Sequence, residues 1–195
     1  MIEKAAGRQQ ERREALVIAA YDLIAASGFE GLRTRDVAAR AGVNIATLHY
    51  YFPSKEDLIG AVVAHALQRF RSTLQPRDSA AEQLRDHFRA LRRLLSREPQ
   101  LAAVMGELAL RSSRDRALAR MLKDAYDVWH KTVRGLLRHG VERGSLDRRL
   151  DTDGVAALVV ATLTAITLPT VAAHPERVDQ AIRQLERLLA PPTRD

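Results

Sequence analysis

The sequence predicts an all-α protein of about nine helices. Apolar residues recur at intervals of three and four along most of the chain, which is the spacing of one buried helical face. No alternation of apolar and polar residues is long enough to predict a strand. Ala, Leu and Arg are abundant and favour helices, whereas only 5% of the residues are aromatic. We therefore expect a fold of packed helices.

The first three predicted helices are closely spaced. The helix from Glu11 to Ser27 has one apolar face, formed by Leu16, Ala19, Ala20, Leu23 and Ile24. Gly28 is expected to end this helix in a left-handed conformation. Thr34 is expected to cap a second helix, which Gly42 interrupts after about two turns. Asn44 is expected to cap a third helix, so the pattern predicts a helix, a tight turn and another helix.

Six longer helices are predicted downstream. Ser54 and Asp57 resemble a capping box for the fourth helix, which ends near Pro76. The others are expected over residues 80 to 97, 99 to 111, 114 to 143, 152 to 168 and 175 to 190, with start signals at Ser79, Pro99, Ser113, Asp151 and Pro175. The change in helix length predicts two domains, residues 1–55 and 56–195, with the boundary inside the fourth helix.

Composition excludes some classes of protein and leaves others open. The chain has no cysteine, which excludes disulfides, thiolate metal sites and cysteine nucleophiles. Neither a secretion signal nor an apolar run longer than Val155 to Val160 is apparent, so we expect a cytoplasmic protein without a membrane segment. The net charge is +7, yet residues 1–60 hold eight basic and eight acidic side chains. Bulk charge therefore does not separate a DNA-binding protein from one with a soluble, Arg-rich surface.

The third helix has the character of a DNA-reading helix. Val43, Leu48 and Phe52 can point inward, which leaves an outer face of Ile45, Ala46, Thr47, His49 and Tyr50. The small Ala46 allows close approach to the major groove, and the Thr47 and Tyr50 hydroxyls can bond to phosphates or base edges. His49 can do the same or simply be solvated. On spacing alone, a plain helical corner remains the alternative.

Groups suited to phosphates surround this helix. They are Thr34 and Arg35 at the second helix, Lys55 at the fourth, and Arg8, Arg12 and Arg13 on the first. Arg12 and Arg13 fit an exposed helix face equally well. The predicted DNA-binding residues are Thr34, Arg35, Asn44, Ile45, Ala46, Thr47, His49, Tyr50, Lys55 and Arg12.

The run from Gly28 to Leu58 resembles the amino-terminal domain of the TetR family of bacterial repressors. The similar segment covers about residues 10 to 60 and includes Thr47-Leu48-His49-Tyr50-Tyr51-Phe52. His49 departs from the family pattern, which has a tyrosine there that contacts the DNA backbone. The resemblance implies a helix-turn-helix DNA-binding domain followed by a helical domain for ligand sensing and dimerisation. It also implies that the protein represses transcription.

Two carboxy-terminal helices are predicted to form a homodimer interface. Their apolar faces contain Val155, Leu158, Val159, Thr162, Leu163, Ile166, Val178, Ile182, Leu185 and Leu189. Two such helices from each chain can pack as a four-helix bundle in the manner that the family resemblance suggests. Packing within one chain is the alternative. A two-fold dimer predicts a pseudo-palindromic operator in double-stranded DNA.

The middle helices are expected to enclose a small-molecule effector that releases the repressor from its operator. The candidate lining residues are Phe88, Leu91, Leu95, Met105, Leu108, Met121, Tyr126, Trp129, His130 and Val133. Ordinary core packing is the alternative for each of these residues and the preferred interpretation for most of them. We expect no cofactor and no metal.

Two other functional classes fit the sequence less well. An enzyme is disfavoured because the histidines form no metal-ligand motif and no nucleophile signature or Gly-rich phosphate loop occurs. A membrane-surface protein is suggested only by the basic amphipathic stretch from Arg85 to Arg97, which also fits a solvated helix face over a leucine stripe. A regulator of transcription is the preferred interpretation.

Overall fold

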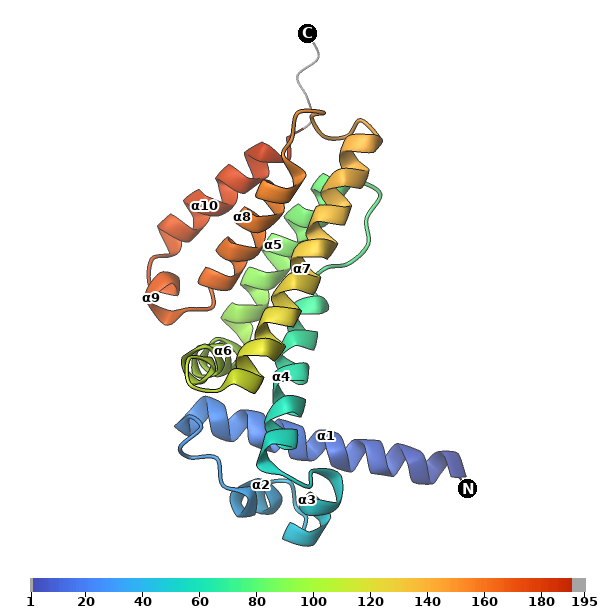
Figure 1. The fold of residues 1–195 in the computed structure, drawn as a ribbon, viewed down its shortest axis with the longest axis vertical. Helices are drawn as coiled ribbons and strands as arrows, with labels where there is room; N and C mark the ends of the chain where they lie inside the picture. The colour runs from blue at the N-terminus through green and yellow to red at the C-terminus, as the bar shows by residue number, and fades with distance from the viewer. Residues whose placement is uncertain (1, 191–195) are drawn as a thin grey trace.

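Ten α-helices form the regular structure of a computed structural model that describes residues 2–190, with side chains described from residue 7 onward. No strand occurs in that range, which confirms the all-α prediction. The molecule is elongated, with α1, α2 and α3 at one end and the longer helices at the other (Figure 1). No helix in the described part of the chain has the length and apolarity needed to cross a bilayer.

The amino-terminal end consists of α1 (Ile2–Ser27), α2 (Thr34–Arg40) and α3 (Ile45–Tyr51). Helix α1 begins earlier than predicted, because its polar first turns have no apolar periodicity. Gly28 ends α1 with a φ of 65°, as expected for a left-handed terminator. Asn44 caps α3 by accepting a hydrogen bond from the Thr47 amide. The predicted cap at Thr34 is wrong, since Arg33 precedes α2 and makes no side-chain capping bond.

Helix α4 (Lys55–Arg71) leads from this end into the rest of the molecule. Its start is fixed by the predicted capping box, in which the Ser54 hydroxyl accepts from the Asp57 amide and the Asp57 carboxylate accepts from the Ser54 amide. The first half of α4 contacts α1, and its last turns lie among the longer helices. One continuous helix therefore connects the two ends of the molecule.

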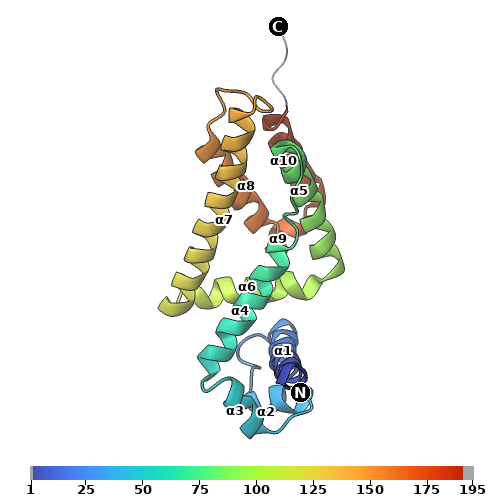
Figure 2. The same cartoon turned by 90° about the vertical axis from the view of Figure 1, so that its right-hand side faces the viewer.

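The larger part comprises α5 (Ala80–Arg97), α6 (Pro99–Ser112), α7 (Arg116–Glu142), α8 (Thr152–Ala165), α9 (Pro169–Ala172) and α10 (Pro175–Leu188). In Figure 2, α5 and α7 diverge toward α6, which closes the base of a triangle that α4 enters. Helices α8 and α10 pack on α7 and α5. The short α9 was not predicted, because α8 ends at Ala165 and Pro169 starts a separate turn.

One further predicted cap is wrong. Ser113 does not start α7, because its hydroxyl donates to the Leu110 carbonyl at the end of α6. The cap is Asp115, whose carboxylate accepts from the amides of Ala117 and Leu118. The starts at Ser79, Pro99, Asp151 and Pro175 are confirmed.

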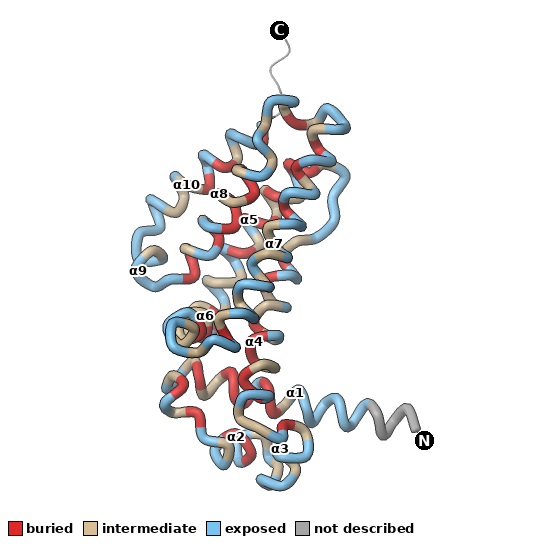
Figure 3. Tube along the Cα trace, in the orientation of Figure 1, coloured by how far each residue is buried: buried red, intermediate tan, exposed pale blue. Residues whose placement is uncertain are grey.

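Buried residues run through both ends of the molecule as one hydrophobic core (Figure 3). Helix α6 lies where the two ends meet and packs on α1, α4, α5 and α7. The short helices therefore rest directly on the helices of the larger part. Because the core is closely packed, a shift of α6 or α4 would displace residues at both ends of the molecule.

Candidate DNA interface and ligand cavity

The exposed side of α3 has the composition expected of a DNA-reading surface. Leu48 and Phe52 are 1% and 2% exposed and anchor the helix in the core, as predicted. Ile45, Ala46 and His49 face solvent, and Tyr50 is 71% exposed. A short helix that is held on one side and bears small, aromatic and polar groups on the other can enter a major groove.

Thr47 is tied to the start of α3. Its backbone amide and its hydroxyl both donate to Asn44 Oδ1, at 2.8 and 2.9 Å. The Thr47 hydroxyl proton is therefore engaged within the protein, and its oxygen is left as an acceptor. The Asn44 side-chain NH2 group has no acceptor among the described residues and can donate to a phosphate or a base.

A hollow of about 370 Å³ lies between α1 and α3. It is lined by Gln9, Arg12, Asn44, Ala46, Thr47, Tyr50 and Tyr51. The hollow brings the predicted Arg12 beside the exposed face of α3. Gln9 was missed, although its position one helical turn before Arg12 on α1 indicates the shared face. Arg13 is also exposed but does not line the hollow, and its guanidinium lies 5.1 Å from the centre of the Phe52 ring.

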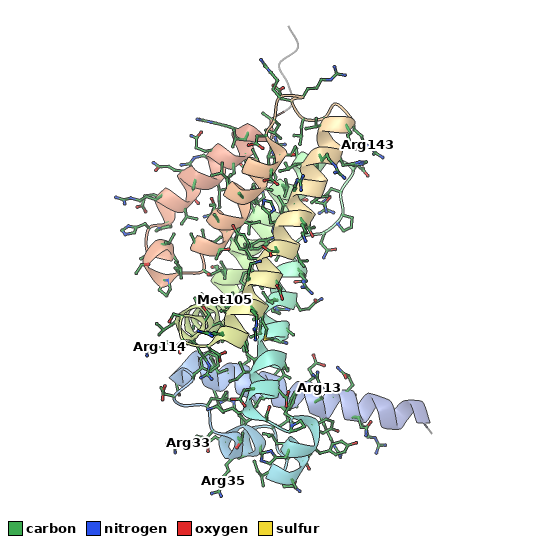
Figure 4. All side chains as sticks on the ribbon, in the orientation of Figure 1. Arg13, Arg33, Arg35, Met105, Arg114 and Arg143 are labelled. Atoms are coloured by element: carbon green, nitrogen blue, oxygen red, sulfur yellow. The ribbon has the colours of Figure 1, made fainter. Side chains whose placement is uncertain are left out.

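Unpaired cations flank α3. Lys55 is the first residue of α4, and Thr34 and Arg35 lie in the first turn of α2. Figure 4 shows Arg33 and Arg35 projecting from the α2 end, away from the larger part. Among the described side chains, no carboxylate lies within 4.0 Å of the nitrogens of Arg12, Arg33, Arg35 or Lys55, whereas Arg40 pairs with Asp22 at 3.2 Å. These free charges can neutralise phosphates without first breaking an ion pair.

A second cavity, of about 450 Å³, lies in the larger part between α4, α6, α7 and α8. Three of the predicted effector residues line it: Met105, Tyr126 and Trp129. The other predictions place residues wrongly. Phe88, Leu91, Leu108 and Val133 are fully buried core, whereas Met121, His130 and Leu95 lie outside the lining. Apolar periodicity identifies a buried face but not whether that face meets a neighbour or a void.

Most of the lining was missed by the sequence analysis. It consists of Leu67, Phe70 and Arg71 on α4 and Leu74 just beyond it, Ala109 on α6, Leu122, Ala125, Val128 and Thr132 on α7, and Leu163, Thr164, Thr167 and Leu168 at α8 and just beyond it. The last turns of α4 enter the larger part of the molecule. No local sequence pattern predicts that position. Leu163 was assigned to the dimer interface and instead faces the cavity.

A buried histidine supports the wall of this cavity. Thr73 Oγ1 donates to the Phe70 carbonyl at 2.6 Å and lies 2.8 Å from His87 Nδ1, so the His87 Nδ1–H is the donor to Thr73. Burial lowers the pKa of His87 to about 4, and the ring stays neutral at physiological pH. The ring meets Trp129 edge-on, with 5.8 Å between centroids. His87 therefore packs against the indole from the core side.

The predicted dimer face is largely occupied within the chain. Seven of its ten residues are buried in a single chain: Val155, Val159, Leu163, Ile166, Ile182, Leu185 and Leu189. Thr162 and Val178 are half-buried, and Leu158 is 53% exposed. The surface stripe of α8 instead consists of Gly154, Leu158, Ala161 and Ala165, spaced at four, three and four. This stripe of three small residues and one leucine is exposed or half-buried in the single chain.

Comparisons with known proteins agree with this architecture. Residues 16–62 match the family described as bacterial regulatory proteins, tetR family. Residues 74–185 match the family described as tetracyclin repressor-like, C-terminal domain. Together the two matches cover α3 and all of the cavity lining except Leu67, Phe70 and Arg71.

Individual relatives are similar over different lengths. The HTH-type transcriptional repressor KstR of Rhodococcus jostii (strain RHA1) is 32% identical over 99 residues, which are 50% of this chain and 47% of KstR. The HTH-type transcriptional regulator PksA of Bacillus subtilis (strain 168) is 25% identical over 195 residues, 95% of this chain and 94% of PksA. The chain thus spans about half the length of KstR and nearly all of PksA.

Solved structures share the fold. The crystal structure of a putative TetR-family transcriptional regulator from Rhodococcus sp. superposes with a TM-score of 0.76 at 22% identity. It covers 93% of this chain and 100% of that one. At this identity the likeness concerns the fold.

Proposed function

Because the chain belongs to the TetR family of bacterial regulatory proteins, we propose that it is a homodimeric repressor that a small apolar ligand releases from a pseudo-palindromic operator. The family matches make it a transcriptional regulator with a helix-turn-helix DNA-binding domain. The proposal adds the reading residues, the dimer, the ligand and the coupling between cavity and DNA. The domain division remains as proposed from the sequence, residues 1–55 for DNA and 56–195 for ligand and dimer.

The exposed face of α3, together with the free cations around it, is the observation that carries the proposal. Ile45, Ala46 and Tyr50 are exposed on α3, where they can contact base edges in the major groove. We propose that Arg12, Arg35 and Lys55 hold phosphates, with Thr34, Asn44, Thr47 and His49 as further polar contacts. The cations supply affinity and register, while α3 supplies sequence preference.

The dimer is proposed to form through α8, with its surface stripe of Gly154, Leu158, Ala161 and Ala165. Small residues at this spacing allow two helices to approach closely, and the aliphatic Leu158 can fill the space opposite its copy. A two-fold interface buries the same patch on both chains. It places two α3 helices so that they can read two half-sites about one turn of DNA apart.

Helices α4 and α6 are proposed to couple the cavity to the DNA surface. Both helices contribute lining residues, and both pack against α1. A ligand that favours one arrangement of these helices changes the spacing of the two reading helices, and operator affinity falls accordingly. By the same linkage, the operator lowers the affinity for the ligand.

Selection of bound duplexes from a random DNA pool tests the proposed function. The wild type is expected to enrich a two-fold symmetric sequence, and the Thr47→Ala, Tyr50→Ala double variant is expected to lose it. A thermal melt of the variant confirms that it is folded. Enrichment of an asymmetric sequence contradicts the dimer, and equal enrichment by the variant contradicts the assignment of α3.

A further inference from the structure

The ligand cavity has an unusual distribution of charge, and the inference drawn from it rests on the proposed function. Twelve of its sixteen lining residues are aliphatic, aromatic or methionine, and three of the others are threonines. Arg71 is the one charged residue among them, and no Asp, Glu or Lys lines the cavity in the described part of the chain. An apolar ligand fits these walls, and any anionic group on that ligand has a single cation to meet.

Arg71 is available for such a pairing. It is the last residue of α4 and is exposed at the rim of the cavity. Its neighbour Arg69 is held by Glu98 in a bidentate pair, but no described carboxylate lies within 4.0 Å of the Arg71 guanidinium. A hydrated guanidinium at the mouth of an apolar cavity suits a carboxylate, which it can bind through two parallel hydrogen bonds.

Three threonines give the cavity a second polar feature. The Thr132 hydroxyl donates to the Val128 carbonyl at 2.8 Å, the Thr164 hydroxyl to the Val160 carbonyl at 2.8 Å, and the Thr167 hydroxyl to the Thr164 carbonyl at 2.7 Å. Each hydroxyl proton is thus already used by the helix backbone. The oxygens that remain act as acceptors, so they suit a ligand that donates an O–H or N–H.

An aromatic wall holds the body of the ligand. Phe70 and Trp129 lie with 6.4 Å between ring centroids and 37° between ring planes. His87 supports Trp129 from within the core, as described above. This wall is therefore preformed, and an aliphatic or ring-shaped body can pack on it without reorganising the core.

We propose that the cavity binds an apolar carboxylic acid that also has a hydroxyl or amide donor. Its carboxylate pairs with Arg71 at the rim, and its hydrocarbon body lies on Phe70 and Trp129. Its donor group bonds to the oxygen of Thr164 or Thr167. Neutral hydrocarbons and cationic amphiphiles lack the pairing with Arg71 and bind more weakly.

Fluorescence of Trp129, the only tryptophan, reports binding directly. The probes are ω-hydroxydodecanoate, dodecanoate and dodecanol, which share one chain and differ only in the two polar groups. Wild-type protein is expected to bind dodecanoate about tenfold more tightly than dodecanol, the effect of one charge-assisted pair. It is expected to bind ω-hydroxydodecanoate more tightly still.

Variants separate the two polar features. Arg71→Gln is expected to remove the preference for dodecanoate over dodecanol, and Arg97→Gln, at an exposed arginine outside the cavity, is expected to keep it. Thr167→Val, which preserves shape, is expected to reduce the preference for the ω-hydroxyl group if Thr167 rather than Thr164 receives it. The Thr164→Val variant tests the other oxygen.

The outcomes distinguish the ligand class from the proposed function. Equal binding of dodecanol and dodecanoate, a preference that survives Arg71→Gln, or no binding of any probe overturns the ligand class. Operator release by dodecanol with no preference for the acids overturns the class but leaves the repressor function standing. If the acids bind in an Arg71-dependent way but leave operator affinity unchanged, the ligand class is supported. The coupling between the cavity and the operator is then overturned.

Discussion

The backbone amide of Phe29 donates a hydrogen bond to Glu107 Oε2 at 3.4 Å, which joins the end of α1 to the middle of α6. The Arg111 guanidinium lies 4.9 Å from the centre of the Phe29 ring, one helical turn further along α6. Met105 and Ala109 of the same helix line the cavity. Residues two apart in a helix point about 200° apart, so opposite faces of α6 meet the cavity and the DNA-binding end.

Removing the Glu107 carboxylate should weaken the coupling between ligand and operator. In Glu107→Ala the Phe29 amide loses its acceptor, and a movement of α6 is passed on less fully to α1. We expect the ratio of operator dissociation constants with and without ligand to fall about threefold or more, within the range seen for coupling residues. Fluorescence anisotropy of a labelled operator measures it. Glu107→Gln keeps a carbonyl acceptor and should keep the ratio; an unchanged ratio in Glu107→Ala would refute this route.

Arg35 should contribute to operator affinity through phosphate. In Arg35→Gln we expect weaker binding to all duplexes and a slope of log affinity against log salt that is smaller by about 1. The control is Arg143→Gln, which removes an arginine that Figure 4 places at the opposite end of the molecule. Titrations over a series of salt concentrations give the slope. Equal slopes for both variants would show that Arg35 does not touch the backbone.

A charge on the surface of α8 should separate the dimer. Leu158→Glu places a carboxylate in the proposed interface, opposite its own copy, where neither charge is paired. Light scattering at micromolar concentration should then report a monomer, and operator affinity should fall at least tenfold because two half-sites are no longer read together. Leu110→Glu is the matched control at a residue of α6 that is 67% exposed. A Leu158→Glu protein that stays dimeric places the interface elsewhere.

Stability should decrease in acid because of His87. In the unfolded chain the imidazole titrates near 6.5, and burial lowers the pKa in the folded protein to about 4. Between these values the unfolded state binds more protons, so the free energy of unfolding falls as the pH drops from 6.5 toward 4, by up to about 3 kcal/mol. Urea unfolding across this range should give a flatter curve for His87→Gln. The His139→Gln variant, changed at an exposed histidine, should show the same pH dependence as the wild type. If the free energy of unfolding of His87→Gln fell with pH as steeply as that of the wild type, other groups would account for the acid sensitivity.

The DNA-binding end was predictable because its signals are local. Asn44, Gly28 and the pair Ser54 and Asp57 determine helix ends through bonds within a few residues, and the sequence contains those spacings directly. The inward faces of α1 and α3 follow from periodicity in the same way. The position of the Arg13 guanidinium over the Phe52 ring was not predictable, because it depends on how α1 crosses the end of α3.

The cavity and the dimer surface were much less predictable. Phe70 and Phe88 have similar sequence surroundings, yet one lines a void and the other is packed on all sides. Val155 and Leu158 are one turn apart on α8, but α7 and α10 cover only the first. Which face of a helix stays open depends on the tertiary arrangement of several helices. The residue pattern of a single helix does not determine that arrangement.

Dimethyl sulfate protection of a selected duplex tests the central assignment most directly, because the reagent methylates guanine N7 in the major groove. We expect the wild type to protect guanines in two half-sites about one helical turn apart. The Thr47→Ala, Tyr50→Ala variant should lose that protection at concentrations where it still binds DNA through phosphates. Binding that leaves the N7 positions reactive, or protection that the variant retains, would contradict the conclusion that α3 reads the operator.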